Sequence, residues 1–269
     1  MSTIDDNAVG LYLKESAKSL SQYAVTKYNQ DAFIKSAMLA IVDNPAIKEC
    51  LTTPAGKTSL FNALRYASST GLSLNPQQGK AALIGYGGKV QYQVMKNGII
   101  DLAMRSGKVE FVTCDTVREN DKFEVEKTSD GDKFSFKPAT KDRGKISGFF
   151  AACKLTTGST MIKWMTVEEI EDHRDRYSSM FKAKPEASPW SKSFEGMGLK
   201  TVIKALFRNL SISDELDAAM GSDDKSENEI INITPGFSSD DAAAKLSEKK
   251  KSSEAKDAAK EEPQTKMDF

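Results

Sequence analysis

With 269 residues, 39% of them hydrophobic, the chain can fold as one large domain or two small ones around a buried core. Its single histidine, His173, and the absence of a Cys-x-x-Cys pair exclude a multi-histidine or paired-cysteine metal site. The formal net charge is zero, but residues 221–269 carry twelve acidic and eight basic residues, so the preceding part has four more basic than acidic ones. A basic body with an acidic tail is typical of proteins that bind polyanions.

No apolar run approaches the ~18 residues of a transmembrane helix. The first ten residues lack the basic start and apolar stretch of a signal peptide. The three cysteines are scattered, which suits a reducing compartment. We therefore expect a cytoplasmic protein that uses neither a membrane nor a metal or other cofactor.

The first predicted elements are helices. Residues 1–30 are expected to be helical in part and otherwise disordered. Residues 31–70 contain two helical stretches, "DAFIKSAMLAIVD" and "GKTSLFNALRYASST", and Gly71 is a natural C-terminal cap for the second.

The stretch "AGKTS" at residues 55–59 has two interpretations. Gly-Lys-Thr running into a helix occurs in the phosphate loop G-x-x-x-x-G-K-[ST], where it follows a buried strand. The first glycine of that pattern would fall at Leu51, and the residues before it do not form an apolar strand. A helix start, with Thr52 or Thr53 as N-cap and Pro54 in the first turn, explains the same residues. We favour the helix start over an ATP-binding loop.

After Gly71 the apolar residues alternate, which predicts strands. "KAALIGYGGKVQYQV" indicates a hairpin about Gly87-Gly88. A short helix is expected over 97–107, ended by Gly107. Further strands are expected over 108–126, 132–139, 145–155 and 159–165.

Two helix starts follow the strands. Thr166 and Glu169 form a capping box that begins a helix over 167–177, and Ser188 with Pro189 begins a longer helix over 189–210. Helices, antiparallel strands and helices again, in that order, predict an α+β fold.

The last predicted helix carries Lys200, Lys204 and Arg208 four residues apart. Each step of four residues exceeds a full turn by about 40°, so the three cations form one winding stripe, with Lys192 two turns before it. A rigid basic stripe suits a phosphate backbone, although a solvated helix face has the same appearance.

Further basic residues flank aromatic and amide side chains. The predicted hairpin contains Gln91 and Tyr92 among its lysines, and Trp190 precedes the stripe. Aromatic rings beside basic residues are typical of single-stranded nucleic-acid binding. Tyr92 and Trp190 suit a hydrophobic core equally well.

Two sequence blocks resemble the RecT family of phage and prophage recombination proteins. The first has a Leu-x-Pro segment at 74–76, Val-Gln at 90–91, "GIIDLAMRSG" at 98–107 and "VRENDKF" at 117–123. The second, "SPWSKSFEGMGLKTVIKALFRNLSIS", resembles the family helix P-W-x(6)-M-x-x-K-T-x-I-[KR]-x-L-F. The resemblance extends over about residues 57–213. Where many members have G-Y-[KR]-G, this chain has "MKNG" at 95–98.

The resemblance implies a protein without enzymatic chemistry. It would bind single-stranded DNA and anneal complementary strands in homologous recombination without ATP, as an oligomeric ring or helical filament. The implied partners are single-stranded DNA, the annealed duplex intermediate, further copies of the chain, a 5′–3′ exonuclease and the single-strand binding protein of the host. An ATP-dependent P-loop-type recombinase, a virion or scaffold protein and a non-annealing single-strand coating protein are the alternatives.

Three parts are expected: a partly disordered helical segment (1–30), a DNA-binding annealing domain (31–221) and a disordered acidic tail (222–269). The tail ends in "MDF" behind two glutamates, which suits a protein-docking tip. No catalytic or metal-binding residue is expected. The residues expected to contact DNA are Lys80, Lys89, Gln91, Tyr92, Lys96, Arg105, Lys108, Trp190, Lys192, Lys200, Lys204 and Arg208.

Overall fold

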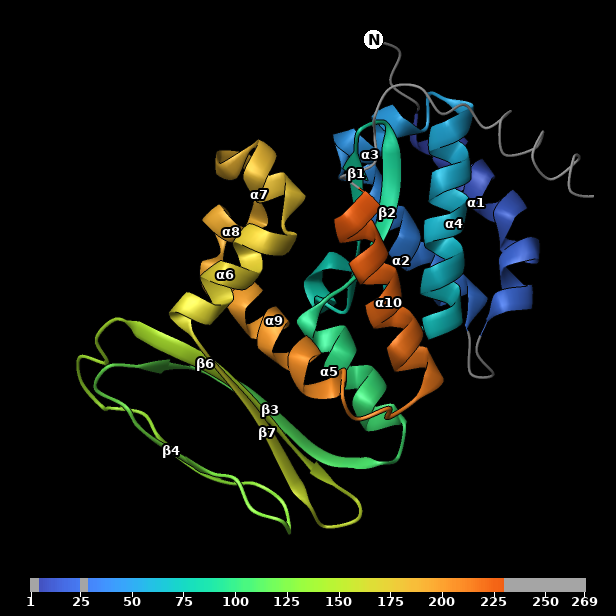
Figure 1. The fold of residues 1–269 in the computed structure, drawn as a ribbon. Helices are drawn as coiled ribbons and strands as arrows, with labels where there is room; N and C mark the ends of the chain where they lie inside the picture. Colours follow the sequence, from blue (N-terminus) through green and yellow to red (C-terminus); the bar gives the residue numbers. More distant parts are fainter. Residues whose placement is uncertain (1–4, 25–28, 230–269) are drawn as a thin grey trace, which may run out of the picture. The chain divides into compact units, whose positions relative to one another are not determined.

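The structure, a computed structural model, describes residues 5–24 and 29–229, with only the backbone described for 224–229 (Figure 1). The α-helices are α1 (Asp6–Leu20), α2 (Gln30–Val42), α3 (Pro45–Cys50), α4 (Pro54–Thr70), α5 (Lys96–Arg105), α6 (Val167–Tyr177), α7 (Ser179–Ala183), α8 (Pro189–Lys192), α9 (Phe194–Phe207) and α10 (Asp214–Glu229). Short 3₁₀ turns lie at η1 (Ser21–Tyr23), η2 (Pro76–Gln78) and η3 (Pro185–Ala187). The strands are β1 (Ala81–Tyr86), β2 (Lys89–Val94), β3 (Val109–Arg118), β4 (Lys122–Glu126), β5 (Lys133–Lys137), β6 (Ile146–Leu155) and β7 (Thr160–Thr166). This order confirms the predicted α+β class.

The stretch "AGKTS" is the first turn of α4. Thr53 is the N-cap, and its side-chain oxygen accepts a hydrogen bond from the Gly56 N–H. The preceding element is the helix α3, and a Cβ added at Gly56 would lie 1.7 Å from the carbonyl oxygen of Cys50. Gly56 is therefore a packing glycine between two helices, and the phosphate-loop interpretation is wrong for this stretch.

The predicted hairpin is confirmed. Strands β1 and β2 pair antiparallel up to Tyr86 and Lys89, and both turn glycines have positive φ, 57° at Gly87 and 74° at Gly88. These values favour glycine because other residues are strained there. One face of β2 buries Tyr92 between two valines, and this face packs with α4 and α10.

A second sheet has the strand order β3–β6–β7, antiparallel throughout. Successive side chains of β6 point to opposite faces, and both faces are covered. Phe149 belongs to the main core, beside α9, whereas Phe150 packs with the separate hairpin β4–β5. The ring centroids of Phe123 and Phe136 in that hairpin lie 5.1 Å and 5.0 Å from that of Phe150.

The capping box at Thr166 and Glu169 is confirmed, with hydrogen bonds in both directions. The single helix predicted over 189–210 is wrong. The chain leaves the helical conformation at Ser193, where φ is −153° and ψ is 72°, so α8 and α9 are separate helices. Lys192 therefore does not share a helix with Lys200.

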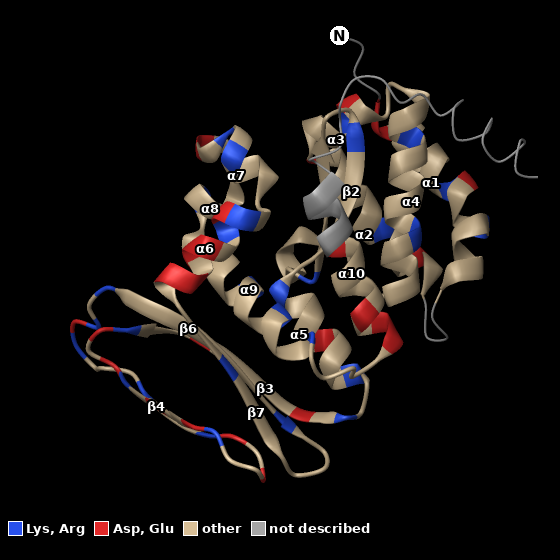
Figure 2. Ribbon diagram, in the orientation of Figure 1, with Lys and Arg blue, Asp and Glu red and all other residues tan. Residues whose placement is uncertain are grey.

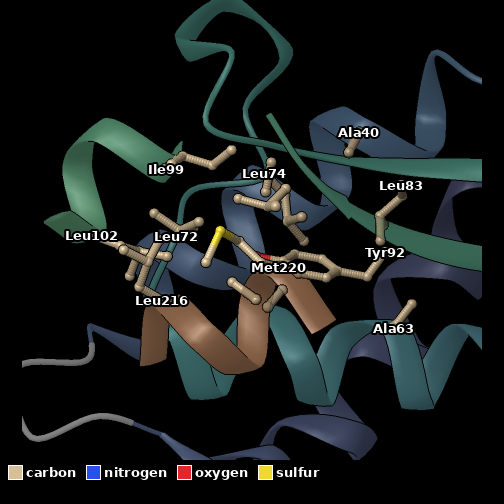
Figure 3. Packing of buried hydrophobic residues seen from close by; sticks show 14 of the residues in the cluster. Ala40, Ala63, Leu72, Leu74, Leu83, Tyr92, Ile99, Leu102, Leu216 and Met220 are labelled. Atoms are coloured by element: carbon tan, nitrogen blue, oxygen red, sulfur yellow. The ribbon is translucent and has the colours of Figure 1, made fainter. Parts of the chain in front are cut away.

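The main hydrophobic core joins segments from most of the described chain. Figure 3 shows Tyr92 of β2 packed among Leu72, Leu74, Leu216 and Met220. Helix α10, which the sequence analysis does not predict, supplies the last two of these. It also extends over 222–229, the first residues of the expected tail. The remaining tail, 230–269, lies outside the described residues.

Helix α1 belongs to the same core, because one of its faces is buried there. Its buried residues are Val9, Leu13, Ala17 and Leu20. No helix within residues 5–24 and 29–229 is long and apolar enough to cross a membrane.

Candidate nucleic-acid interface

The β1–β2 hairpin separates the polar residues that the sequence places together. Lys89 is exposed beside the turn and Gln91 is half-buried, whereas Tyr92 is only 3% exposed. The Tyr92 hydroxyl lies 3.0 Å from Oγ1 of Thr70. Burial raises the pKa of Tyr92 well above its usual value. Tyr92 is therefore a core residue that cannot stack on a base in this conformation.

Trp190 is also buried in the core. It is 6% exposed and packs against Phe194, with ring centroids 6.1 Å apart. The buried ring anchors the short helix α8, whose last residue, Lys192, is exposed. Of the two expected DNA contacts in α8, only Lys192 lies at the surface.

Asp101 of α5 binds two of the predicted basic residues, Lys80 before β1 and Arg105 at the end of α5. Its carboxylate lies 3.1 Å from Nζ of Lys80 and 3.2 Å from Nε of Arg105. The Arg105 guanidinium also donates to the Thr70 carbonyl at 2.9 Å. These contacts hold both cations in place while a third or more of each side chain stays exposed.

Two more predicted residues lie near this pair in the chain, Lys96 between its members and Lys108 after them. Lys96 is half-buried in the first turn of α5, and Lys108 is exposed in the turn after it. The turn contains Gly107 with a φ of 72°, which confirms the predicted helix end. The chain from 80 to 108 thus carries five of the expected cations, on or beside the hairpin and α5.

An open pocket of about 510 Å³ lies next to Arg105. The start of α2 and the segment after α4 line it, and they contribute Lys35, Asn75 and Gln78. Residues of this kind suit hydrogen bonds to phosphates and base edges. The sequence does not predict these three side chains as DNA contacts, because a pocket between distant segments produces no pattern among neighbouring residues.

Two of the three cations of the expected stripe on α9 are not at the surface. Lys200 and Lys204 are 5% and 8% exposed. Both bind Asp223 of α10, whose two carboxylate oxygens lie 2.9 Å and 2.6 Å from their Nζ atoms. The expectation of a solvated basic stripe is therefore wrong for these two lysines, because Asp223 of α10 binds both ammonium groups in the interior.

The electrostatics of Asp223 follow from this arrangement. Burial raises the pKa of Asp223, but the neighbouring charges of Lys200 and Lys204 outweigh it, so the pKa lies below its usual value. The carboxylate stays ionised at neutral pH, as two buried ammonium groups require. Arg208, the third member of the expected stripe, is exposed at the C-cap of α9.

The surface charge is uneven among the elements. Figure 2 shows basic residues on α7, α8 and β2 and around the contact of α5 with α9, whereas the starts of α6 and α10 are acidic. The exposed members of the predicted set are Lys89, Arg105, Lys108, Lys192 and Arg208. These five residues define the exposed basic set of the candidate interface.

Comparison with known proteins gives two kinds of similarity. The sequence model of the RecT family matches residues 31–235. Protein RecT of Escherichia coli (strain K12) is 31% identical over 217 residues, which cover 78% of this chain and 76% of that protein. The uncharacterized protein YqaK of Bacillus subtilis (strain 168) is 26% identical over 177 residues, 65% of this chain and 59% of that protein.

Proposed function

This chain belongs to the RecT family, and we propose that it binds single-stranded DNA and anneals complementary strands without ATP during homologous recombination. The family match over residues 31–235 carries the proposal, because it includes the β1–β2 hairpin, α5, the sheet β3–β6–β7, the β4–β5 hairpin and α9. The mechanism is physical, and no residue is assigned a catalytic step.

The independence from ATP is supported by the start of α4. A phosphate loop would need free backbone N–H groups in "AGKTS". Here the Gly56 N–H donates to the Thr53 side chain, and the Lys57 N–H donates to the Thr53 carbonyl. The amides that would hold a nucleotide are therefore engaged in starting the helix.

The exposed basic set provides the proposed contacts with DNA. Lysine and arginine side chains neutralise phosphates that would otherwise repel each other when two strands approach, and the release of counterions favours binding. Watson–Crick pairing then supplies the sequence specificity. Oligomerisation as a ring or helical filament would align many such surfaces and raise the effective concentration of the strands.

The partners follow from the same proposal. A 5′–3′ exonuclease would produce the single-stranded DNA ends, and the tip of the C-terminal tail, "MDF" at 267–269, would dock a partner such as the single-strand binding protein of the host. The protein would then act on DNA in the cytoplasm of a bacterial cell. Light scattering with and without DNA tests the oligomer, and titration of each purified partner against the full chain and a chain lacking 230–269 tests the docking.

The decisive test mixes two complementary dye-labelled oligonucleotides with the protein in the absence of nucleotide. We expect faster duplex formation than in a protein-free control. If three or four phosphates are neutralised per protomer, the logarithm of the affinity should fall with that of the salt concentration at a slope of about −2 to −3. A coating protein would bind the strands and slow annealing, and a P-loop recombinase would need ATP.

The variant Lys89→Ala/Lys108→Ala tests the exposed basic set. Loss of two phosphate contacts should flatten the salt slope by about 1.4 and slow annealing at moderate salt. Lys14→Ala, an exposed lysine on α1, is the matched control. An unchanged slope in the double variant, or equal losses in the control, would exclude these residues as the binding surface.

A further inference from the structure

The contact between α9 and α10 resembles an occupied phosphate site. One anionic group, the Asp223 carboxylate, accepts a hydrogen bond on each of its oxygens from Lys200 and Lys204. A backbone phosphate of DNA also offers two anionic oxygens on one centre and forms charge-assisted hydrogen bonds with lysine. It can therefore replace the carboxylate at the same two ammonium groups.

The part of α10 that carries Asp223 is separate from the part that fills the core. Leu216, Ala219 and Met220 are buried and hold the first half of the helix in place. Asp223 comes after the last of these, with Gly221 and a serine between them. Unwinding of the chain from Gly221 onward would therefore release Asp223 and leave the core residues packed.

The sequence of this second half weakens the helix. Glycine is about fivefold less favourable than alanine inside a helix, and a Cβ added at Gly221 would meet no atom within 4 Å, so packing does not require a glycine there. The last turn contains no basic residue, and acidic residues near a helix C-terminus oppose its dipole. The ion pairs of Asp223 with Lys200 and Lys204 join the start of this second half to α9.

We propose that Lys200 and Lys204 form a phosphate-binding site that Asp223 occupies in the free protein, and that single-stranded DNA enters this site when the end of α10 unwinds from Gly221 onward. The inference rests on the proposed DNA binding and adds its regulation. The acidic helix end competes with DNA for two cations of α9. The exposed basic set captures the strand first, and displacement of Asp223 then adds two phosphate contacts.

We call the form in which Asp223 binds both lysines closed, and the form in which the chain from Gly221 onward has unwound open. The sharpest test stabilises the closed form without changing the lysines. Gly221→Ala fills open space and favours the helix, so the open form becomes less populated and the apparent affinity falls in proportion. With a fluorescein-labelled oligothymidine and the full chain, fluorescence anisotropy should show binding about two- to fivefold weaker. Gly10→Ala is the matched control, since an added Cβ in α1 meets only ordinary contacts at 3.9 Å, and its affinity should equal that of the wild type.

Asp223→Asn tests the opposite direction. Loss of the negative charge weakens the hold of α10 on both lysines, and binding should become tighter by up to about tenfold. Hydrogen exchange on the full chain provides a direct view of the helix end. Addition of oligothymidine should speed exchange at 221–229 and leave 214–220 as protected as before.

Three results would overturn the inference. These are an affinity of Gly221→Ala equal to that of the wild type, weaker binding by a folded Asp223→Asn, and unchanged or slower exchange at 221–229 with DNA. The annealing rate of the same samples separates the two proposals. If the wild type binds DNA but does not anneal it, only the proposed function is contradicted. If the wild type anneals DNA and Gly221→Ala binds as tightly as the wild type, only the displacement of Asp223 is contradicted. If the wild type does not bind DNA, both proposals are contradicted.

Discussion

At the scale of single residues, carboxylates determine what the basic side chains of this protein can do. Asp101 holds Lys80 and Arg105 at the surface, whereas Asp223 draws two lysines of α9 into the interior. The difference lies in burial, because the side chains around Asp223 are almost fully buried and those around Asp101 stay partly exposed. The type of residue alone therefore does not decide whether a cation can meet DNA.

Asp121 gives a prediction at this scale. Its buried carboxylate accepts hydrogen bonds from Arg143, at 2.7 Å, and from the backbone N–H groups of Arg118 and Ala139. The guanidinium of Arg143 holds the pKa of Asp121 well below its usual value. Asp121→Ala should lower the free energy of unfolding at pH 7 by about 2 to 4 kcal/mol, as measured by urea denaturation. Glu124→Gln, on the exposed side of β4, is the control and should have little effect.

The pH dependence of this loss has a definite sign. Because the pKa of Asp121 is lower in the folded protein than the ~3.9 of an unfolded aspartate, its contribution is complete above that value and disappears as the pH falls toward the folded pKa. The stability difference between wild type and Asp121→Ala should be constant from pH 8 to 5 and shrink below about pH 4. A difference that grows on acidification would contradict the assigned ion pair.

At the scale of elements, α9 is a helix with partners on two sides. It packs on the sheet β3–β6–β7 and on α5, and its two buried lysines form ion pairs with Asp223 of α10. Six of its buried residues are apolar or small, but its two buried lysines show that a polar side can be internal too. The helix is therefore a central support of the fold and also the carrier of the proposed phosphate site.

Gly198 lies where α9 packs tightly on Phe149 of that sheet. A Cβ at this position would lie 2.6 Å from the Phe149 ring, which is fully buried. Gly198→Ala should therefore destabilise the protein by about 1 to 3 kcal/mol through overpacking, as measured by urea denaturation. Gly196→Ala in the same helix meets only the movable Ser193 hydroxyl at 2.7 Å and should cost little. Equal stability of the two variants would contradict this packing.

At the scale of the whole described molecule, one core unites segments that the sequence suggests are separate. Helix α1, expected to be part of a loosely ordered segment, buries a face in the same cluster as the hairpin, α5 and α9. Helix α10 closes that cluster through Leu216 and Met220 and meets β2, α4 and α5. The compact unit consequently includes both described stretches, 5–24 and 29–229.

Truncation tests the extent of this unit. A chain that ends at residue 213 loses the buried Leu216 and Met220, each worth about 1.5 to 3 kcal/mol, and leaves Lys200 and Lys204 without Asp223. We expect it to be largely unfolded or to melt far lower in circular dichroism. A chain that ends at residue 229 retains these contacts and should melt with the full chain. Similar melting of both truncated chains would contradict the role given to α10.

The sequence by itself determined the local features and the family. The turn at Gly87-Gly88, the capping box at Thr166 and the helix start in "AGKTS" depend on residues a few positions apart, so short patterns predict them. The α+β order follows from the same kind of signal, and the two motif blocks indicate the RecT family independently of the fold.

Only the tertiary structure decided which of the predicted DNA contacts are available. Tyr92 and Trp190 are buried, and Lys200 and Lys204 are covered by Asp223, which lies 23 and 19 residues further along the chain. The helical spacing of the lysines was correct, but a spacing shows only that residues share a face. Whether that face meets water or another helix depends on how distant segments pack, because burial is set by the packed elements and not by the local sequence.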